Sequence, residues 1–161
     1  MSVRIAFDPS IVTTGYAVLK GKELVTFGDI KVKGKDLSQR LAYLSKQVQL
    51  LIESYQPGQA AVEKAPSFSY ARSTNGFTGK GVNAEAILIN GYATGAILAA
   101  LGMAGVRAQE LDAHTWKKMG NFNPGKDYMI NLARSLYPFL RGVELSDHAA
   151  EAICMAHLCQ I

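Results

Sequence analysis

The chain has 161 residues, 48% of them hydrophobic and 19% charged, and carries a net charge of +4 at neutral pH. This length and composition predict one globular domain over residues 1–161, and the basic balance favours a polyanionic partner such as nucleic acid. No group of Cys and His has the spacing of zinc ligands, and Cys154 and Cys159 are expected to be free thiols of a reducing compartment, which excludes a zinc-finger or disulfide scaffold.

The N-terminal third predicts three strands, at residues 3–7, 14–19 and 23–30. The turn at residues 20–22, Lys-Gly-Lys, joins the second strand to the third as in a hairpin. The first strand ends on a carboxylate, Asp8. A charge at the end of a buried strand is costly unless it is paired or bound to a metal ion. The alternative is that Asp8 caps the turn that follows, since Asp before Pro is a common turn starter.

The middle of the chain alternates helix and strand. Apolar residues recur with helical period over residues 36–55, and a short apolar strand, residues 59–62, then leads into Glu63. Residues 65–81 predict a long polar loop dotted with aromatic side chains, of a length that is often functional. The longest helix is expected over residues 83–103. Its most apolar run is interrupted by glycine and threonine and is too short to span a bilayer, so no membrane segment is expected.

The last third predicts a fifth strand at residues 106–111, a short helix at 113–119, a glycine-bearing loop at 120–125, and helices at 126–136 and 147–161. Three strands that form hairpins, followed by alternating helices and strands, are typical of a mixed sheet with helices on its faces. The expected class is therefore α/β.

Carboxylates recur where elements begin or end. Asp8 and Glu63 each end an apolar strand, and neighbouring strands would bring both to one edge of the sheet. The last helix opens with Asp147 and His148, and Glu151 lies three or four residues later on the same helical face. Three or four such ligands from separate elements can hold two Mg²⁺ ions about 4 Å apart for phosphoryl chemistry. The alternative for the helix is favourable electrostatics at its N-terminus.

Three segments together carry a resemblance to a known family. IAFDPSIVTTGYAV, AAVEKA and DHAAEAICMAH, in this order, resemble the motifs of RuvC-type Holliday-junction resolvases of the ribonuclease H-like superfamily. Two positions depart from the family pattern: Glu151 replaces the usual Asp, and Pro66 replaces an aromatic residue. The resemblance implies a five-stranded mixed sheet of ribonuclease H type. Compact size and these departures would suit a phage-encoded member.

The resemblance also implies the chemistry. It makes Asp8, Glu63 and Glu151 metal ligands, with His148 as the fourth and Asp147 as its competitor. Two Mg²⁺ ions per site, with Mn²⁺ as a substitute, would activate a water molecule. The family lysines that contact DNA and assist cleavage correspond to Lys117 and Lys126. The implied activity is that of a homodimeric endonuclease that resolves four-way junctions, and other branched DNA, by paired nicks.

Further contacts to DNA are expected from cationic and aromatic side chains of the two loops and their flanks. These residues are Lys64, Phe68, Tyr70, Arg72, Phe77, Lys80, Lys117, Lys118 and Lys126. Each lysine has the alternative of a solvated surface position, and each aromatic residue that of ordinary loop packing. His114 and Trp116 are given no role, and His157 is expected in the core.

Three other functions stay open at this stage. The chain could be a ribonuclease H-like nuclease acting on flaps or RNA–DNA hybrids, a junction-binding protein without catalysis, or a fragment of an actin-like ATPase, which begins with a similar strand motif. The expected location is the cytoplasm of a bacterium or of a phage-infected host.

Overall fold

A single five-stranded mixed sheet forms the centre of the molecule in the computed structural model, which describes residues 2–65, 84–119 and 126–158. The strands are ordered β3-β2-β1-β4-β5. They are β1 (Val3–Asp8), β2 (Thr13–Lys20), β3 (Glu23–Lys31), β4 (Gln59–Glu63) and β5 (Arg107–Leu111). The first three strands are antiparallel neighbours, and β4 and β5 run parallel to β1. The sheet confirms the expected α/β class and its five strands.

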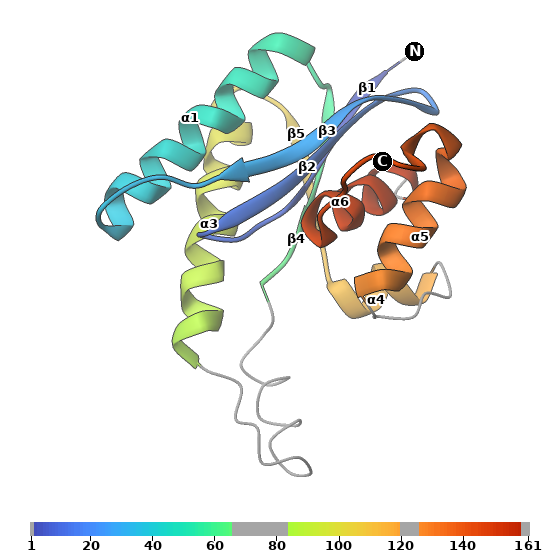
Figure 1. Cartoon of the computed structure of the whole chain (residues 1–161). Coiled ribbons are helices and arrows are strands. Elements are labelled where there is room, and N and C mark those ends of the chain that lie inside the picture. The colour runs from blue at the N-terminus through green and yellow to red at the C-terminus, as the bar shows by residue number, and fades with distance from the viewer. Residues whose placement is uncertain (1, 66–83, 120–125, 159–161) are drawn as a thin grey trace, which may run out of the picture.

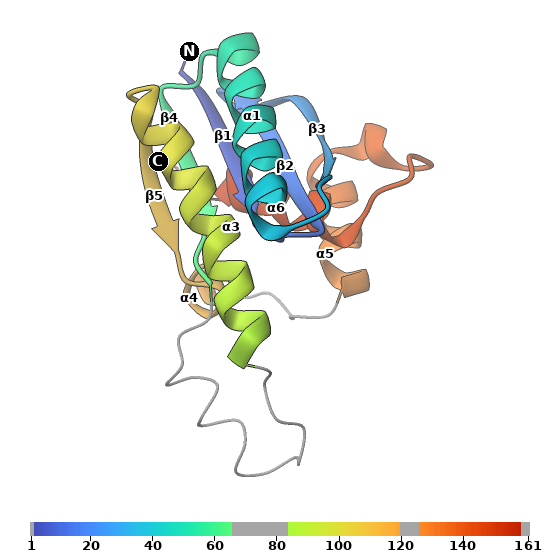
Figure 2. The same ribbon diagram turned by 90° about the vertical axis from the view of Figure 1, so that its left-hand side faces the viewer.

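Helices cover both faces of the sheet (Figure 1). On one face lie α1 (Leu37–Tyr55) and α3 (Ala84–Met103), which Figure 2 shows side by side in front of the strands. On the other face lie α5 (Lys126–Leu136) and α6 (Asp147–Leu158). The short helix α4 (Ala113–Met119) follows β5 and leads toward α5. A single 3₁₀ turn after α5, η1 (Pro138–Leu140), was not expected from the sequence.

Strand alternation divides the apolar residues between two cores. Ile5 and Phe7 of β1 are buried against α1 and α3, whereas Ala6 between them faces α6. Because successive side chains of a strand point to opposite faces, the next residue, Asp8, lies on the α6 side. In β4 the pattern repeats, since Val62 belongs to the α1–α3 core and Glu63 follows it. Both strand-end carboxylates are thereby placed on the face that α6 covers.

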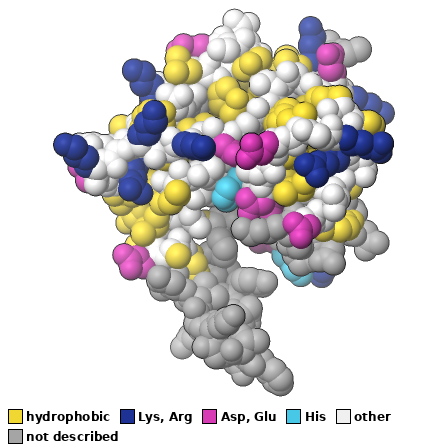
Figure 3. Space-filling model, in the orientation of Figure 1, with side chains coloured by type: hydrophobic (Ala, Val, Ile, Leu, Met, Phe, Trp, Pro, Cys, Tyr) yellow, Lys and Arg dark blue, Asp and Glu magenta, His cyan; other side chains and the backbone are white. Residues whose placement is uncertain are grey.

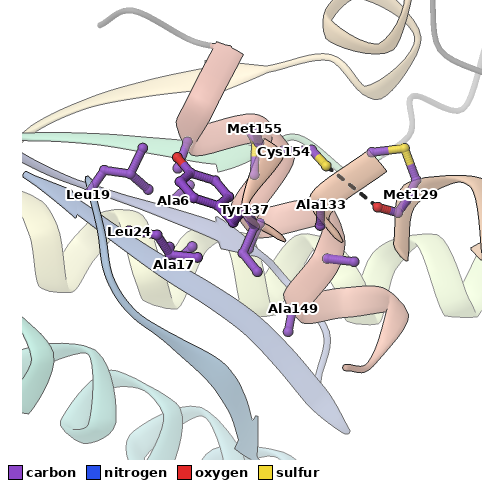
Figure 4. Close-up of a cluster of buried hydrophobic side chains, with 14 of the residues drawn as sticks. Ala6, Ala17, Leu19, Leu24, Met129, Ala133, Tyr137, Ala149, Cys154 and Met155 are labelled. Atoms are coloured by element: carbon purple, nitrogen blue, oxygen red, sulfur yellow. Dashed lines mark hydrogen bonds between the residues drawn. The ribbon is translucent and has the colours of Figure 1, made fainter. Parts of the chain in front are cut away.

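Small side chains let α6 lie close to the sheet. Ala6 and Ala17 of the strands and Ala149 of α6 are all buried in this core, which Figure 4 shows together with Tyr137 and Met155. Further apolar residues of α5 seal the outer side, where the Cys154 thiol lies 3.7 Å from the Met129 carbonyl oxygen. Cys154 is buried and free, as expected, and Cys159 lies outside the described residues. A close helix brings its first turns within reach of Asp8 and Glu63.

The helix α3 is apolar over a longer stretch than the sequence analysis expected. The helical run is longer than the apolar run within it, and by length and composition alone Glu85–Met103 is apolar enough to cross a membrane, with a mean hydropathy of 1.6. Core helices pass the same test. In this structure α3 packs on α1, β4 and β5, and Ile97 and Leu101 are fully buried. One side of α3 therefore packs on the core of the molecule, and 33% of the apolar window is buried.

Candidate active site

Three carboxylates from three elements meet at one end of the sheet. Oxygen atoms of Asp8, Glu63 and Glu151 all lie within 4.8 Å of one another. The parallel register of β1 and β4 pairs Phe7 with Val62, so Asp8 and Glu63 leave adjacent strands side by side. Glu151 reaches them from the second turn of α6. We call these three residues the carboxylate cluster.

The start of α6 is held over β2 by a glycine. Gly15 pairs with Asp8 in the β1–β2 register, and a side-chain carbon at this position would overlap the backbone carbonyl of His148 and lie 2.8 Å from the Ala149 nitrogen. Only glycine leaves room for this approach. The Thr-Gly pair of the first sequence motif therefore has a structural reason, because it lets the helix that carries His148 and Glu151 come down beside Asp8.

A hydrogen-bonded cap fixes where α6 begins. The Ser146 hydroxyl accepts a hydrogen bond from the Ala149 amide at 3.0 Å and donates one to Asp29 of β3 at 2.7 Å. Ser146 is thus the N-cap residue of α6. Asp29 was not singled out from the sequence, because its distance from Ser146 along the chain hides the contact. Together the two residues fix the height of the first helical turn above the sheet.

His148 contacts the carboxylate cluster through Asp8. Its Nδ1 atom lies 2.6 Å from Asp8 Oδ2, and this hydrogen bond raises the pKa of the imidazole against the opposing effect of burial. The group of ligand atoms that all lie within 4.8 Å of one another includes neither His148 nor Asp147. Asp147 lies in the first turn of α6, half buried.

Lysine and tryptophan side chains of α4 complete the site. Lys117 Nζ lies 2.7 Å from Glu151 Oε2 and 4.0 Å from Glu63 Oε2. Trp116 Nε1 donates a 2.9 Å hydrogen bond to Glu63 Oε2, and Lys117 Nζ lies 5.2 Å from the centre of the Trp116 ring. Trp116 therefore has a role that sequence reasoning missed. An indole N–H needs a partner when it is buried, but the sequence does not indicate which partner.

Charge and burial act together on the pKa values of the site. Burial, with a contribution from the neighbouring Asp8 charge, raises the pKa of Glu63 to about 7. Burial also raises the pKa of Glu151, although its hydrogen bond to Lys117 opposes this. Burial opposes protonation of Lys117, but Glu63 and Glu151 outweigh it and raise the pKa of that ammonium group. Burial, with repulsion between the carboxylates, thus opposes ionisation of Glu63 and Glu151, and a divalent cation between them would favour their charged forms.

The donor set suits a hard divalent ion. Carboxylate oxygens are the ligands that Mg²⁺ and Mn²⁺ take in proteins, and one imidazole adjoins them. Figure 3 shows acidic side chains gathered around a histidine near the middle of this face, with Lys and Arg side chains to both sides. Such an arrangement can hold a metal ion between the protein and a phosphate group.

The remaining sequence-predicted residues divide into two groups. Lys64 and Lys118 are exposed beside the site, at the end of β4 and on α4. Phe68, Tyr70, Arg72, Phe77 and Lys80 lie outside the described residues, as does the side chain of Lys126. His114 is exposed on α4, and His157 is half buried with its Nδ1 2.9 Å from the Tyr137 hydroxyl.

Comparisons with known proteins place the chain among junction nucleases. The model of the family described as crossover junction endodeoxyribonuclease RuvC matches residues 5–157. A protein of that description from Wolbachia pipientis wMel is 32% identical over 163 residues, which cover 95% of this chain and 93% of the relative. Another from Rickettsia felis is 28% identical over 165 residues, which cover 98% and 96%.

Solved structures show the same fold. T. thermophilus RuvC in complex with a Holliday junction substrate superposes with a TM-score of 0.76 at 19% identity, over 98% of this chain and 92% of that one. The yeast mitochondrial Holliday junction resolvase Ydc2 gives a TM-score of 0.60 at 13% identity, over 97% and 78%. These likenesses confirm the ribonuclease H-like sheet that the sequence motifs implied.

Proposed function

The chain belongs to the crossover junction endodeoxyribonuclease RuvC family, and on that premise we propose that it resolves four-way DNA junctions by paired, metal-dependent nicks. The observation that carries the proposal is the carboxylate cluster, in which Asp8, Glu63 and Glu151 lie within 4.8 Å of one another. A protein that only binds DNA has no use for three carboxylates facing phosphates, which would repel the ligand. A nuclease that holds divalent ions requires them.

Asp8, Glu63 and Glu151 would hold the metal, with His148 as the fourth ligand in preference to Asp147. Mg²⁺, two ions per site, is the proposed cofactor, with Mn²⁺ as a substitute. When bound, the ions supply activation of the attacking water and neutralisation of charge on the scissile phosphate. The hydrogen bond between His148 and Asp8 favours His148, because it already places the imidazole beside one ligand.

The side chains around the cluster orient the ligands and the substrate. Trp116 holds Glu63 by its indole N–H, which fixes one carboxylate oxygen and leaves the other free. Lys117 balances Glu63 and Glu151 in the DNA-free chain and is positioned to contact a phosphate oxygen. Lys126 is proposed as the second lysine that assists cleavage. The DNA contacts proposed for the two loops and their flanks complete this surface.

Two copies of the chain are proposed to act together as a single-domain homodimer, in the cytoplasm of a bacterium or phage-infected host. A four-way junction has two-fold symmetry, and a two-fold dimer can place one carboxylate cluster at each of two strands. The outer side of α3 offers a surface for this contact, since Leu88 is 48% and Tyr92 43% exposed. Light scattering on the purified chain tests the dimer directly.

The function is tested with an end-labelled synthetic four-way junction and a linear duplex of the same sequence, with and without Mg²⁺. We expect symmetric nicks in the junction alone, dependent on Mg²⁺ and lost in Asp8→Asn. The matched control is Glu53→Gln, the same change of acid to amide at an exposed position of α1, which should nick normally. Faster cutting of a flap or an RNA–DNA hybrid would show that this other nucleic acid, and not the four-way junction, is the preferred substrate. Junction binding without nicking under any divalent ion would overturn the nuclease assignment.

A further inference from the structure

The connection between β3 and α1 carries a concentration of positive charge. Lys31, Lys33, Lys35 and Arg40 lie within ten residues that contain one carboxylate, Asp36, so this segment holds a net charge of +3 when the whole chain holds +4. The three lysines are exposed, and none forms an ion pair with another described residue. The Asp36 carboxylate is occupied as the N-cap of α1. We call residues 31–40 the basic segment.

The backbone of the basic segment is held in one path. The Val32 amide donates to the Val12 carbonyl at 2.9 Å, which ties the segment to the turn between β1 and β2. The Arg40 guanidinium donates from Nε to the Gly34 carbonyl at 3.2 Å. Gly34 has a φ of +150°, and a side chain there would lie 2.6 Å from the Arg40 amide nitrogen. A fixed backbone lowers the entropy that binding must overcome, as expected for a built binding surface.

Sheet register connects this segment to the carboxylate cluster. Asp8 pairs with Gly15, and Gly15 pairs with Asp29, so the three residues form one row across β1, β2 and β3. Lys31 follows Asp29 by two residues on β3, hence on the same face of the sheet and about 6.6 Å further along. Figure 3 shows Lys and Arg side chains over the β3–α1 connection on the face that presents the histidine and acidic side chains. Positive charge therefore continues from Lys31, on the α6 face at the end of β3, into the connection that leads to α1.

We propose that the basic segment binds the phosphate backbone of one duplex arm of branched DNA whose branch point lies at the carboxylate cluster. The proposal rests on the function proposed above and names the surface that carries an arm. Exposed lysines that form no ion pair with another described residue suit contacts to the DNA backbone, which position DNA without selecting a sequence. The contribution should therefore be electrostatic, sensitive to salt and independent of sequence.

The test compares two double variants with the same change in net charge. Lys33→Glu/Lys35→Glu alters the basic segment, and Lys20→Glu/Lys22→Glu alters exposed lysines at the β2–β3 hairpin, the opposite end of the sheet. Binding of a labelled four-way junction and of a linear duplex is measured in EDTA between about 50 and 200 mM NaCl. Thermal unfolding confirms that both variants fold.

We expect the basic-segment variant to lose at least tenfold in junction affinity at about 50 mM salt, and its slope of log affinity against log salt to flatten by about 2. The hairpin variant should keep the wild-type slope. If the basic-segment variant and the wild type show the same slope of log affinity against log salt, and both still prefer the junction, the arm contact is overturned and the proposed function stands. A wild type that binds the junction no better than the duplex would overturn the proposed function and the arm contact with it.

Discussion

His148 and Asp8 are hydrogen-bonded at 2.6 Å across two elements that are 140 residues apart in the sequence. The bond joins the end of β1 to the first turn of α6, and it places an imidazole at the rim of the carboxylate cluster. In the DNA-free chain the imidazole satisfies one Asp8 oxygen. The proposed role of His148 as fourth metal ligand rests on this contact, because a metal ion bound to this oxygen would lie beside the imidazole nitrogen.

The identity of the fourth ligand is testable by comparing His148→Ala with Asp147→Ala. We expect His148→Ala to reduce the apparent Mg²⁺ affinity, measured as the Mg²⁺ dependence of junction nicking, by about 10–100-fold. Asp147→Ala should change it by less than about threefold, since Asp147 lies in the first turn of α6 and is not part of the carboxylate cluster. The reverse order of effects would assign the role to Asp147.

Gly15→Ala should damage the site without touching any ligand. The new methyl group would overlap the His148 carbonyl and force the start of α6 away from β2. We expect a loss of about 1–3 kcal/mol in the free energy of unfolding and at least a 100-fold loss in nicking rate, because misplacing ligands by about 1 Å has that effect. Urea unfolding and junction nicking measure the two effects.

The control for that variant is Gly58→Ala. No heavy atom lies within 4 Å of a side-chain carbon placed at Gly58, which directly precedes β4, at the other end of that strand from Glu63. This variant should retain wild-type nicking and stability. If Gly15→Ala behaves in the same way, the close approach of α6 to β2 does not position the site.

The strands and the meeting of Asp8 with Glu63 were predictable from the sequence, whereas the contacts made by α4 and α6 were not. Hydrophobic periodicity predicted every strand, and the carboxylates at strand ends predicted that Asp8 and Glu63 would meet, because both statements depend on local pattern and sheet geometry. The contact of Trp116 with Glu63 and that of Asp29 with Ser146 escaped prediction. Both depend on the height and rotation of a helix over the sheet, which local pattern does not contain.

Trp116→Phe removes the indole donor to Glu63 and keeps most of the ring. The hydrogen bond from Trp116 lowers the pKa of Glu63. Its loss should therefore raise that pKa further and weaken metal binding by about 10–100-fold. The Mg²⁺ dependence of nicking measures this effect. His114→Ala, an exposed position on the same helix, is the matched control and should leave the Mg²⁺ dependence unchanged. An unaltered Mg²⁺ dependence in Trp116→Phe would mean that the indole only fills space.

Lys117→Met separates two roles of one side chain. In the DNA-free chain Lys117 stands as a cation between Glu151 and Glu63, so it competes with a divalent ion for their charge. We expect the variant to bind Mg²⁺ about tenfold more tightly by calorimetry but to nick the junction about 100-fold more slowly. Lys46→Met, at an exposed position of α1, is the matched control and should change neither Mg²⁺ affinity nor the nicking step. Weaker Mg²⁺ binding in Lys117→Met would rule out the competition.

Glu63→Gln should stabilise the metal-free chain at alkaline pH. Below pH 4.5, the ordinary pKa of the group, Glu63 is protonated in both the folded and the unfolded chain, so its titration does not affect the free energy of unfolding. Above it the unfolded chain releases the proton, whereas the folded chain keeps it until about pH 7. The wild type therefore loses stability across this window, and the loss persists at higher pH.

The amide cannot ionise and keeps an oxygen that can accept from Trp116, so at pH 8 in EDTA the variant should be more stable than the wild type by about 1–3 kcal/mol. At pH 4 the two should be equally stable. Addition of Mg²⁺ at pH 8 should reverse their order, because the wild type gains stability from metal binding and the variant has lost a ligand. Urea unfolding at both pH values, with and without Mg²⁺, measures all three comparisons. A variant less stable than the wild type at pH 8 in EDTA would show that Glu63 is already fully compensated by Lys117 and Trp116.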